Sequence, residues 1–500
     1  MFLEKLLANI KCEKIINKTG LSLSEIDISD VCCDSRKARE GSLFVCISGS
    51  LKDGHEYALD AYNTGARIFV CEKEISLPDD AIVIMTDDSR IALAAVSATF
   101  FGEPAKELTV IGITGTKGKT TTSLLIYNVL NANGIKTGYI GSNGVDYGDN
   151  HYITHNTTPE SYDIQYYMRK MADDGVKVLV MEVSSQALML ARVHGIKFHI
   201  SVFTNLYPDH IGKFEHPDFD NYKACKHSLF TDYDTEFVVY NADDPHSSEV
   251  TSGCGCPSKG IAVKGKADYT ADGITFFRSP GTIGVSFNCH VTGASNESFE
   301  VSLAFPGEAS VYNALTSIAV CRRLGVGYDG ICKAMRETRI KGRYETIECP
   351  NGATVVIDYA HNGVSLESAL SALRIYEPNR LICLFGAIGG RTQIRRAELG
   401  LVASRNADLC IITSDNPDNE PPMNIIGEIT TYFNSDSSCP YEAIPDRKKA
   451  IERALKISQK GDIILLAGKG HETYQLVRGI REKFSESEIV KNYCKSLFVE

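Results

Sequence analysis

The fold of this chain is decided by the stretch Val110-Ile111-Gly112-Ile113-Thr114-Gly115-Thr116-Lys117-Gly118-Lys119-Thr120-Thr121-Thr122. An apolar strand runs into a loop of small residues that ends in Gly-Lys-Thr, and the segment 123–130 after it has helical spacing. This order is typical of a phosphate-binding loop, because backbone N–H groups at the helix N-terminus face the phosphate. Lys119 would reach the β- and γ-phosphates of a nucleotide, and the Thr120 hydroxyl would bind Mg²⁺.

One position departs from the common phosphate-loop pattern. That pattern has a glycine five residues before the Gly-Lys pair, and this chain has Ile113 there. The loop therefore indicates that a nucleotide binds. By itself it does not say which class of nucleotide-dependent protein this is.

Composition limits the class of protein. The chain has 500 residues, which suits roughly three domains of ~150 residues each. The net charge of -11 argues against a nucleic-acid partner, which would need a clustered basic surface. The sixteen cysteines are mostly scattered singly through apolar segments, so we expect free thiols in a reducing compartment. Since no apolar run approaches a membrane span, we expect a cytoplasmic protein without membrane insertion.

Strand-like and helix-like segments alternate along most of the chain, which predicts an α/β fold with three domains. Residues 1–105 form a small N-terminal α/β domain, and a Gly/Pro linker follows it. Residues 106–340 form a central domain with a phosphate-loop-type, mostly parallel sheet. Residues 341–500 form a Rossmann-like C-terminal domain.

Polar residues follow two strands of the predicted central sheet. Glu182 ends the apolar segment 178–181, at the edge where ligands of open α/β sheets bind, and is a candidate Mg²⁺ ligand. An exposed acid at a strand end is an equally good interpretation of Glu182 alone. Asp209 and His210 follow a second strand, and a lone pair of this kind is weak support for a site. Lys226 lies in a helical stretch and on residue type alone would be a solvated surface lysine.

Several motifs together resemble those of the Mur ligase family, and in particular its muramoyl-tripeptide synthetase (MurE-type) branch. The resemblance covers all three predicted domains and also explains Ile113, because that family uses a Thr-Gly-Thr-x-Gly-Lys-Thr loop without the leading glycine. The motifs are the loop 114–120, Asp34-Ser35-Arg36-Lys37, Asn156-Thr157-Thr158-Pro159-Glu160, Met181-Glu182-Val183-Ser184-Ser185, and Thr204-Asn205-Leu206 followed by Asp209-His210.

The resemblance implies an ATP-dependent amide ligase of peptidoglycan synthesis. Its substrates would be UDP-N-acetylmuramoyl-L-Ala-D-Glu and a free diamino acid, and it would work as a monomer. ATP would phosphorylate the D-glutamyl carboxylate, and the amine would then attack the acyl phosphate. The implied catalytic residues are Lys119, His210 and Lys226. The implied Mg²⁺ ligands are Thr120, Glu182, His210 and Lys226, the last as a carbamate.

The resemblance also implies three groups of binding residues. ATP would contact Thr114, Gly115, Thr116, Lys117, Gly118, Lys119, Thr120, Thr121, Asn313, Arg343 and His361. The UDP-muramoyl peptide would contact Ser35, Asn156, Thr157, Thr158, Ser184 and Arg192. The incoming amino acid would contact Arg391, Asp415, Asn416, Asp418, Gly468 and Glu472.

The identity of the amino acid depends on Asp418. Family members that add meso-diaminopimelate carry arginine at this position, where it meets the second carboxylate of the substrate. An acid would repel that carboxylate and could accept an ammonium, so the sequence favours L-lysine or a similar diamino acid. The segment Gly468-Lys469-Gly470-His471-Glu472 is common in the diaminopimelate enzymes and favours meso-diaminopimelate instead. The sequence also leaves open a folylpolyglutamate- or cyanophycin-type ligase and a non-catalytic nucleotide-binding protein.

Overall fold

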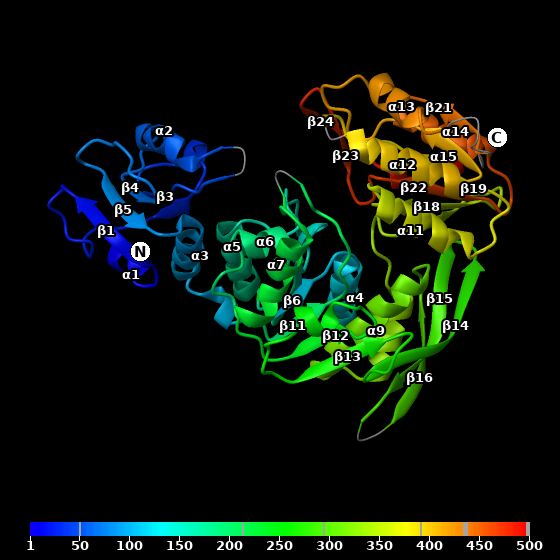
Figure 1. The fold of residues 1–500 in the computed structure, drawn as a ribbon, viewed down its shortest axis with the longest axis horizontal. Coiled ribbons are helices and arrows are strands. Elements are labelled where there is room, and N and C mark those ends of the chain that lie inside the picture. The colour runs from blue at the N-terminus through cyan, green and yellow to red at the C-terminus, as the bar shows by residue number, and fades with distance from the viewer. Residues whose placement is uncertain (50–51, 213–214, 294–295, 391–392, 434–438, 497–500) are drawn as a thin grey trace. The chain divides into compact units, whose positions relative to one another are not determined.

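The computed structural model describes residues 1–500 except 50–51, 213–214, 294–295, 391–392, 434–438 and 497–500 (Figure 1). The chain divides into two compact units. The first comprises residues 1–270 and 315–331, and the second comprises residues 271–314 and 332–500. Because these units group the segments differently from the three predicted domains, the boundaries near 105 and 340 remain predictions.

The N-terminal part of the first unit is a small α/β layer structure, as predicted. Its sheet has the strand order β1-β5-β4-β3-β2, in which only β1 is antiparallel to its neighbour. The strands are β1 (Cys12–Asn17), β2 (Asp30–Cys32), β3 (Ser42–Val45), β4 (Ile68–Cys71) and β5 (Ile82–Thr86). The helices are α1 (Leu3–Leu7), α2 (Ala58–Asn63) and α3 (Ser89–Phe100), with 3₁₀ turns η1 (Ser35–Lys37), η2 (Gly54–Tyr57) and η3 (Pro104–Lys106).

The larger part of the first unit is a mostly parallel sheet in the order β13-β12-β11-β6-β10-β7-β8-β9. Its parallel strands are β6 (Thr109–Thr114), β7 (Thr137–Gly141), β10 (Val178–Glu182), β11 (Ile200–Phe203), β12 (Val238–Asn241) and β13 (Ser258–Ala262). The antiparallel edge strands are β8 (Gly144–Tyr147) and β9 (Asn150–Tyr152). The helices are α4 (Lys119–Ala132), α5 (Ser161–Asp173), α6 (Ser185–Met189), α7 (Phe219–Thr231) and α8 (Ser247–Val250).

The strand β6 lies between β10 and β11, and this order builds the site. Glu182 pairs in register with Ile113, and Phe203 pairs with Thr114. The carboxyl ends of three parallel strands therefore meet beside the loop that follows β6, which is the edge where open α/β sheets bind ligands.

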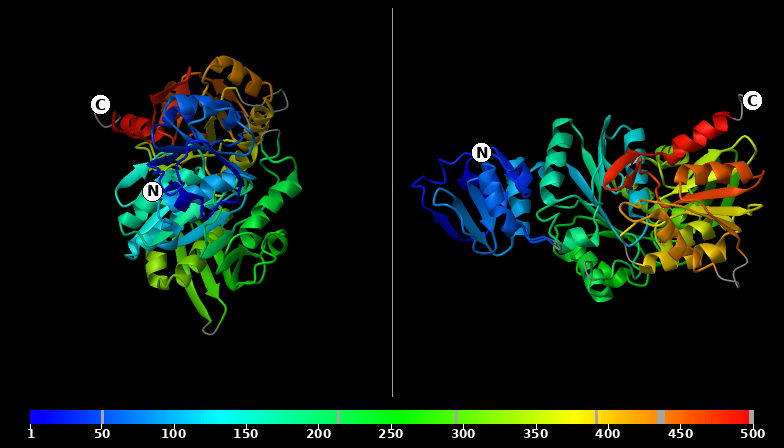
Figure 2. Two further views of the ribbon diagram at one scale, coloured as in Figure 1. Left: turned by 90° about the vertical axis from the view of Figure 1, so that its left-hand side faces the viewer. Right: turned by 90° about the horizontal axis from the view of Figure 1, so that it is seen from above.

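The second unit contains the antiparallel pair of strands β15 (Thr282–Val291) and β16 (Glu297–Leu303) and a separate Rossmann-like sheet. The strands β14 (Tyr269–Ser279), β15 and β16 are neighbours, and β15 and β16 form the long hairpin seen in Figures 1 and 2. The boundary between the two units falls within β14, α9 (Glu308–Arg323) and α10 (Tyr328–Glu337).

The Rossmann-like sheet has the order β17-β18-β22-β19-β20-β21, with only β17 antiparallel. Separate apolar clusters cover its two faces, so the sheet is doubly wound and the predicted fold class is confirmed. The strands are β17 (Glu345–Glu348), β18 (Thr354–Asp358), β19 (Leu381–Phe385), β20 (Leu409–Ile412), β21 (Tyr441–Ala443) and β22 (Ile463–Ala467). The helices are α11 (Gly363–Arg374), α12 (Gln393–Asn406), α13 (Pro422–Thr430), α14 (Arg447–Ile457) and α15 (Glu486–Ser496), and a two-stranded hairpin pairs β23 (Tyr474–Val477) with β24 (Ile480–Lys483).

Among the helices that the structure describes, none has the length and apolar character that crossing a bilayer requires. The sixteen cysteines are all free thiols.

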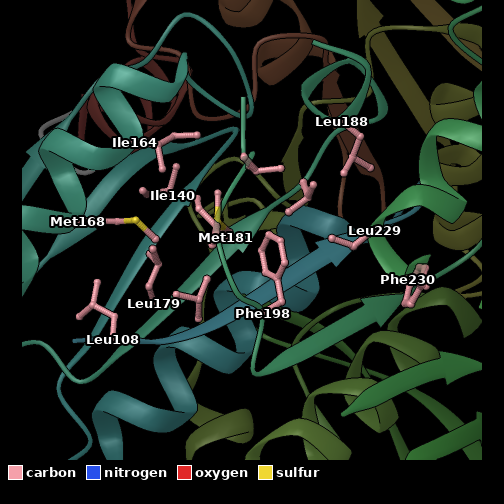
Figure 3. Close-up of a cluster of buried hydrophobic side chains, with 14 of the residues drawn as sticks. Leu108, Ile140, Ile164, Met168, Leu179, Met181, Leu188, Phe198, Leu229 and Phe230 are labelled. Atoms are coloured by element: carbon pink, nitrogen blue, oxygen red, sulfur yellow. The ribbon is translucent and has the colours of Figure 1, made fainter. Parts of the chain in front are cut away.

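The central core packs around Phe198, which belongs to a cluster of fully buried side chains. Figure 3 shows its ring among side chains that include Met181 and Leu229. A Cβ added to Gly112 of β6 would lie 2.6 Å from the Phe198 ring, so the ring rests directly on the strand that leads into the phosphate loop. The glycine at 112 is therefore explained by packing.

We predict that Phe198→Ala lowers the free energy of unfolding of the first unit by about 3–5 kcal/mol, because it leaves a cavity against β6. Denaturant titration followed by circular dichroism measures this change. Ile153→Ala is the control, since Ile153 is 63% exposed and its loss should change stability by less than about 0.5 kcal/mol. A Phe198 variant as stable as this control would contradict the packing argument.

Candidate functional site

The loop between β6 and α4 depends on two glycines with positive φ. Gly115 has a φ of 147° and Gly118, the N-cap of α4, has a φ of 86°. A Cβ added to Gly115 would also lie 1.9 Å from the Thr204 hydroxyl oxygen. Backbone conformation and close packing thus both require glycine at 115, in a loop that leads directly into the N-terminus of α4, the end of a helix that favours an anion.

The segment after β11 holds this loop in place. The Thr204 hydroxyl donates to the Lys117 carbonyl at 2.7 Å, and the Asn205 side-chain oxygen accepts from the Lys117 N–H at 2.8 Å. The Thr116 N–H donates to the Asn205 carbonyl at 2.9 Å. Sequence analysis quoted this segment as a motif but gave neither residue a role, since the pairing joins positions almost ninety residues apart.

Two lysines converge on one carbonyl of the loop. The Lys119 Nζ donates to the Gly115 carbonyl at 2.8 Å and to the Thr116 carbonyl at 3.2 Å. The Lys226 Nζ donates to the same Gly115 carbonyl at 2.9 Å. The structure thus brings together two of the three predicted catalytic residues.

Lys226 is 1% exposed, so its classification as a surface lysine from residue type alone is wrong. Its place on α7 turns it inward, and its Nζ lies 4.5 Å from the centre of the Tyr222 ring one turn earlier. Burial, together with the charge of Lys119, lowers the pKa of Lys226 well below its usual value. The structure therefore favours a neutral amine at this position.

Glu182 is fully buried at the end of β10 and accepts several hydrogen bonds. One carboxylate oxygen accepts from the Tyr139 hydroxyl at 2.6 Å and from the Ser142 N–H at 2.9 Å, and the other accepts from the Thr120 hydroxyl at 3.0 Å. A carboxylate beside a hydroxyl on the phosphate loop is a hard-oxygen donor set of the kind that Mg²⁺ prefers. The predicted ligands Thr120 and Glu182 therefore lie together.

The other two predicted metal ligands make different contacts. His210 has a φ of 58°, and its exposed ring lies 3.3 Å from a Glu215 carboxylate oxygen, whereas Lys226 contacts Gly115. In the described part of the chain, no group of three or more His, Cys, Asp or Glu side chains is arranged to hold a metal ion. The contacts of the described residues thus link Thr120 to Glu182 and do not join His210 to them.

A second histidine, which sequence analysis did not single out, is part of this region. His216 is fully buried, and its two ring nitrogens lie 2.8 Å from the Asn221 side-chain oxygen and 2.8 Å from the Ser185 hydroxyl. Burial lowers its pKa. Its ring centre is 5.1 Å from that of Tyr222, so it packs beside the lysine-bearing face of α7.

The residues expected to bind the UDP-muramoyl peptide fall into two places in the first unit. Near Glu182, the buried Thr158 hydroxyl donates to the Glu182 carbonyl at 2.8 Å and accepts from the Ser184 N–H at 3.1 Å, and the Thr157 hydroxyl lies 3.0 Å from that of Ser142. Arg192 donates to a Glu160 carboxylate oxygen at 2.8 Å and to the Thr158 carbonyl at 3.1 Å. Asn156 is exposed at the edge of this group.

Ser35 lies apart from these residues, in the N-terminal α/β layer. It begins η1, and the Asp34 carboxylate caps that turn by accepting from the Arg36 N–H at 3.1 Å. Ser35 lines a pocket of about 420 Å³ together with Asp34, Arg36, Phe44, Lys52 and Tyr57. This pocket has the polar and aromatic lining that suits a nucleotide base and its phosphates.

In the second unit, the ends of β20 and β22 bring an acidic group together around a buried lysine. The Lys469 Nζ, which is unexposed, donates to the Asn416 side-chain oxygen at 2.9 Å and to a Glu472 carboxylate oxygen at 2.8 Å, and it lies 3.6 Å from Asp415. A Cβ added to Gly468 would lie 2.7 Å from the Asp415 carboxylate. Four of the six predicted amino-acid-binding residues, Asp415, Asn416, Gly468 and Glu472, therefore meet, with Lys469 as an organiser that sequence analysis missed.

Asp418 makes contacts within the second unit that the sequence did not predict. Its carboxylate accepts from the Gly479 N–H at 2.7 Å, in the turn between β23 and β24. Its own N–H donates to the Leu476 carbonyl and its carbonyl accepts from the Arg478 N–H, both at 2.9 Å. The carboxylate for which a substrate ammonium was expected thus accepts a hydrogen bond from the turn of this hairpin. The sixth residue, Arg391, lies outside the described residues.

The predicted ATP-binding residues of the second unit gather partly at the end of β18. The Arg343 guanidinium lies 5.2 Å from the Tyr359 ring centre, and His361 Nδ1 lies 2.9 Å from the Tyr359 carbonyl oxygen. The Tyr344 N–H donates to Asp358 at 3.0 Å, which connects the Arg343 segment to the strand. Asn313 lies on α9.

Comparison with known proteins gives matches along nearly the whole chain. Residues 27–113 match "Mur ligase family, catalytic domain", residues 113–321 match "Mur ligase middle domain", and residues 342–470 match "Mur ligase, glutamate ligase domain". A UDP-N-acetylmuramoyl-L-alanyl-D-glutamate--2,6-diaminopimelate ligase of Caldanaerobacter subterraneus is 39% identical over 93% of this chain and 94% of its own length. One of the same name from Clostridium perfringens is 34% identical over 98% of this chain and 99% of its own.

Solved structures show the same fold. A 2,6-diaminopimelate ligase of that name superposes with a TM-score of 0.68 at 24% identity, covering 100% of this chain and 99% of the other. A folylpolyglutamate synthase from Thermotoga maritima gives a TM-score of 0.57 at 15% identity over 76% of this chain and 89% of its own, which reflects a shared fold alone.

These comparisons decide between the functions that the sequence left open. Full-length identity of 34–39% to ligases excludes a non-catalytic nucleotide-binding protein. They do not support the preference for L-lysine, because the relatives are named for 2,6-diaminopimelate. The chain belongs to the Mur ligase family and is a ligase of its muramoyl-tripeptide synthetase type.

Proposed function

We propose that this ligase adds meso-diaminopimelate to UDP-N-acetylmuramoyl-L-Ala-D-Glu at the expense of ATP, in the cytoplasm and as a monomer. The observation that carries the proposal is the match over 93–98% of the chain to relatives named for this reaction. One oxygen of the Asp418 carboxylate accepts from the Gly479 N–H, so this side chain is engaged in the turn of the hairpin. Diaminopimelate therefore replaces L-lysine as the preferred amino acid.

The chemistry begins at the phosphate loop. A carboxylate becomes reactive when its oxygen takes the γ-phosphoryl group of ATP, which releases ADP and leaves an acyl phosphate. The ammonium of Lys119 and the N–H groups at the start of α4 would stabilise the charge on the transferred group. The amine of the amino acid then attacks the acyl carbon, loses a proton and expels phosphate.

Mg²⁺ would be held by the hydroxyl of Thr120 and the carboxylate of Glu182, which contact each other. The family resemblance adds His210 as a further ligand, although its ring contacts Glu215 in this structure. When bound, it would neutralise charge on the phosphate oxygens. The neutral amine favoured at Lys226 can add to CO₂ to form a carbamate and release one proton. The product would place a negative charge beside the Lys119 ammonium.

The remaining predicted residues would hold the two larger substrates. The pocket around Ser35 would take the uridine diphosphate end, and Asn156, Thr157, Thr158, Ser184 and Arg192 would take the muramoyl peptide. ATP would further contact Asn313, Arg343 and His361. Of the amino-acid-binding set, Asp415, Asn416 and Glu472 offer oxygens to an ammonium.

The amino-acid specificity is tested by measuring phosphate release with the dipeptide substrate, ATP, Mg²⁺ and a panel of amino acids. We expect kcat/KM for meso-diaminopimelate to exceed that for L-lysine by at least about 10-fold, in line with the binding of one additional charged group. Omission of the dipeptide should remove the signal. A preference for L-lysine would contradict the proposed specificity and support the charge argument made from Asp418.

The role of Lys119 is tested by Lys119→Ala. We expect kcat to fall by about 10²–10³-fold, because a charge that stabilises the transferred phosphoryl group is lost. Lys136→Ala is the control, since Lys136 is an exposed lysine of the same unit whose ammonium contacts the Asp174 carbonyl. Equal activities of the two variants would remove Lys119 from the mechanism.

Carbamylation of Lys226 is tested by ¹³C NMR of the protein in ¹³C-bicarbonate. We expect a carbamate resonance that disappears in Lys226→Ala and persists in Lys223→Ala, because Lys223 lies on the same helix but is paired with Glu249 at the surface. Because the pKa of Lys226 is lowered by burial, its amine loses its proton at a lower pH than an ordinary lysine does, and the resonance should weaken as the pH falls and the amine takes up a proton. A signal that persists in Lys226→Ala would exclude this lysine.

A further inference from the structure

A diaminopimelate ligase must recognise a carboxylate that lysine lacks, and this inference therefore rests on the proposed function. The group formed by Asp415, Asn416 and Glu472 presents acceptor oxygens, which suit an ammonium and repel a carboxylate. Its buried cation, Lys469, already contacts all three of these residues. A second carboxylate needs a cation from another element.

The hairpin that packs on this group brings such a cation. Arg481 lies on β24, opposite Leu476 in register, while Tyr474 pairs with Lys483. Arg481 and Tyr474 are therefore diagonal neighbours on one face of the hairpin, and the guanidinium carbon lies 4.6 Å from the Tyr474 ring centre. Lys469 lies 5.6 Å from the same ring, so Tyr474 stands between the buried acidic group and Arg481.

The electrostatic environment of Tyr474 agrees with this geometry. Burial raises the pKa of its phenol, and the charge of Glu472 raises it further, whereas the charge of Arg481 lowers it. Tyr474 thus lies within reach of a negative charge, that of Glu472, and of a positive charge, that of Arg481. A substrate with an ammonium at one end and a carboxylate at the other matches this arrangement of opposite charges.

Asp418 determines where the hairpin lies. Its carboxylate, N–H and carbonyl hydrogen-bond to Gly479, Leu476 and Arg478, respectively. The residues it holds form the turn and the strand opposite Arg481. The position of Arg481 on the hairpin therefore depends on the hydrogen bonds that Asp418 makes.

We propose that Arg481 binds the distal carboxylate of meso-diaminopimelate, and that Asp418 is a positioning residue that fixes the hairpin bearing Arg481. Guanidinium geometry suits a carboxylate, which can accept two parallel hydrogen bonds. Arg481 is exposed, so its replacement leaves the core intact. This residue is then a determinant of amino-acid specificity.

The test compares Arg481→Gln with Lys483→Gln in the full-length enzyme, by steady-state kinetics with each substrate varied in turn. Lys483 is the matched control because it is an exposed cation two residues along the same strand and pairs with Glu488. We expect Arg481→Gln to raise KM for meso-diaminopimelate by about 10- to 100-fold, as for a lost charge-assisted hydrogen bond. KM for ATP and for the UDP-muramoyl dipeptide should stay within about twofold, and kcat/KM for L-lysine should not fall.

A second pair of variants tests the role given to Asp418. Asp418→Asn keeps an acceptor oxygen for the Gly479 N–H and tolerates the φ of 51°, so KM for meso-diaminopimelate should change by less than about threefold. Asp418→Ala loses the acceptor and should raise this KM by about 10-fold or more. A large effect of Asp418→Asn would mean that the charge itself contacts substrate, and would overturn the positioning role.

The outcomes separate this inference from the proposed function. If the wild-type enzyme adds meso-diaminopimelate but Arg481→Gln leaves its KM unchanged, the assignment of Arg481 is wrong and the function stands. The same conclusion follows if Arg481→Gln impairs L-lysine and the dipeptide equally. If the wild-type enzyme rejects meso-diaminopimelate and accepts L-lysine, both the function and the role of Arg481 are overturned.

Discussion

The site depends on one buried carbonyl, that of Gly115, which accepts hydrogen bonds from the amino groups of both Lys119 and Lys226. Two like charges this close repel each other in a buried environment, so only one can remain a cation at low cost. Lys226 is the more deeply buried, and burial together with the charge of Lys119 lowers its pKa. The fold thus places two lysines with different surroundings, one from α4 and one from α7, at a single carbonyl of the loop.

The second unit also contains a buried lysine, but its neighbours differ from those of Lys226. Lys469 is unexposed yet surrounded by Asp415, Asn416 and Glu472, so its ammonium is fully compensated. Removing one partner from such a group would leave an uncompensated buried charge, which is costlier than losing the pair. The difference follows from the neighbours: a loop carbonyl and a second lysine around Lys226, and two acids around Lys469.

Sequence patterns predicted the fold class and the strands that lead into the phosphate loop and Glu182, because apolar runs and glycine-containing loops report local backbone geometry. They failed where a residue's role depends on distant partners. Lys226 lies in a helix whose residue types are typical of a protein surface. It is buried only because α7 packs against the loop. Asp418 invited a charge argument, whereas its carboxylate bonds to the turn at Gly479. No local signal indicated that contact, which joins residues 61 positions apart.

The ends of β20 and β22, which carry the amino-acid-binding residues, are held by a buried ion pair, here called the clamp. The fully buried Arg447 donates to the carbonyls of Ser414 and Ala467 at 3.1 and 2.8 Å and pairs with Glu486. Burying this ion pair has a desolvation cost, and the same arginine fixes the ends of β20 and β22, which lie on either side of β19, to one helix. A change in amino-acid specificity at the clamped ends would disturb the core. The strand β24 is exposed along its whole length and lies outside this clamp, so it is the element on which specificity can change while the sheet stays the same.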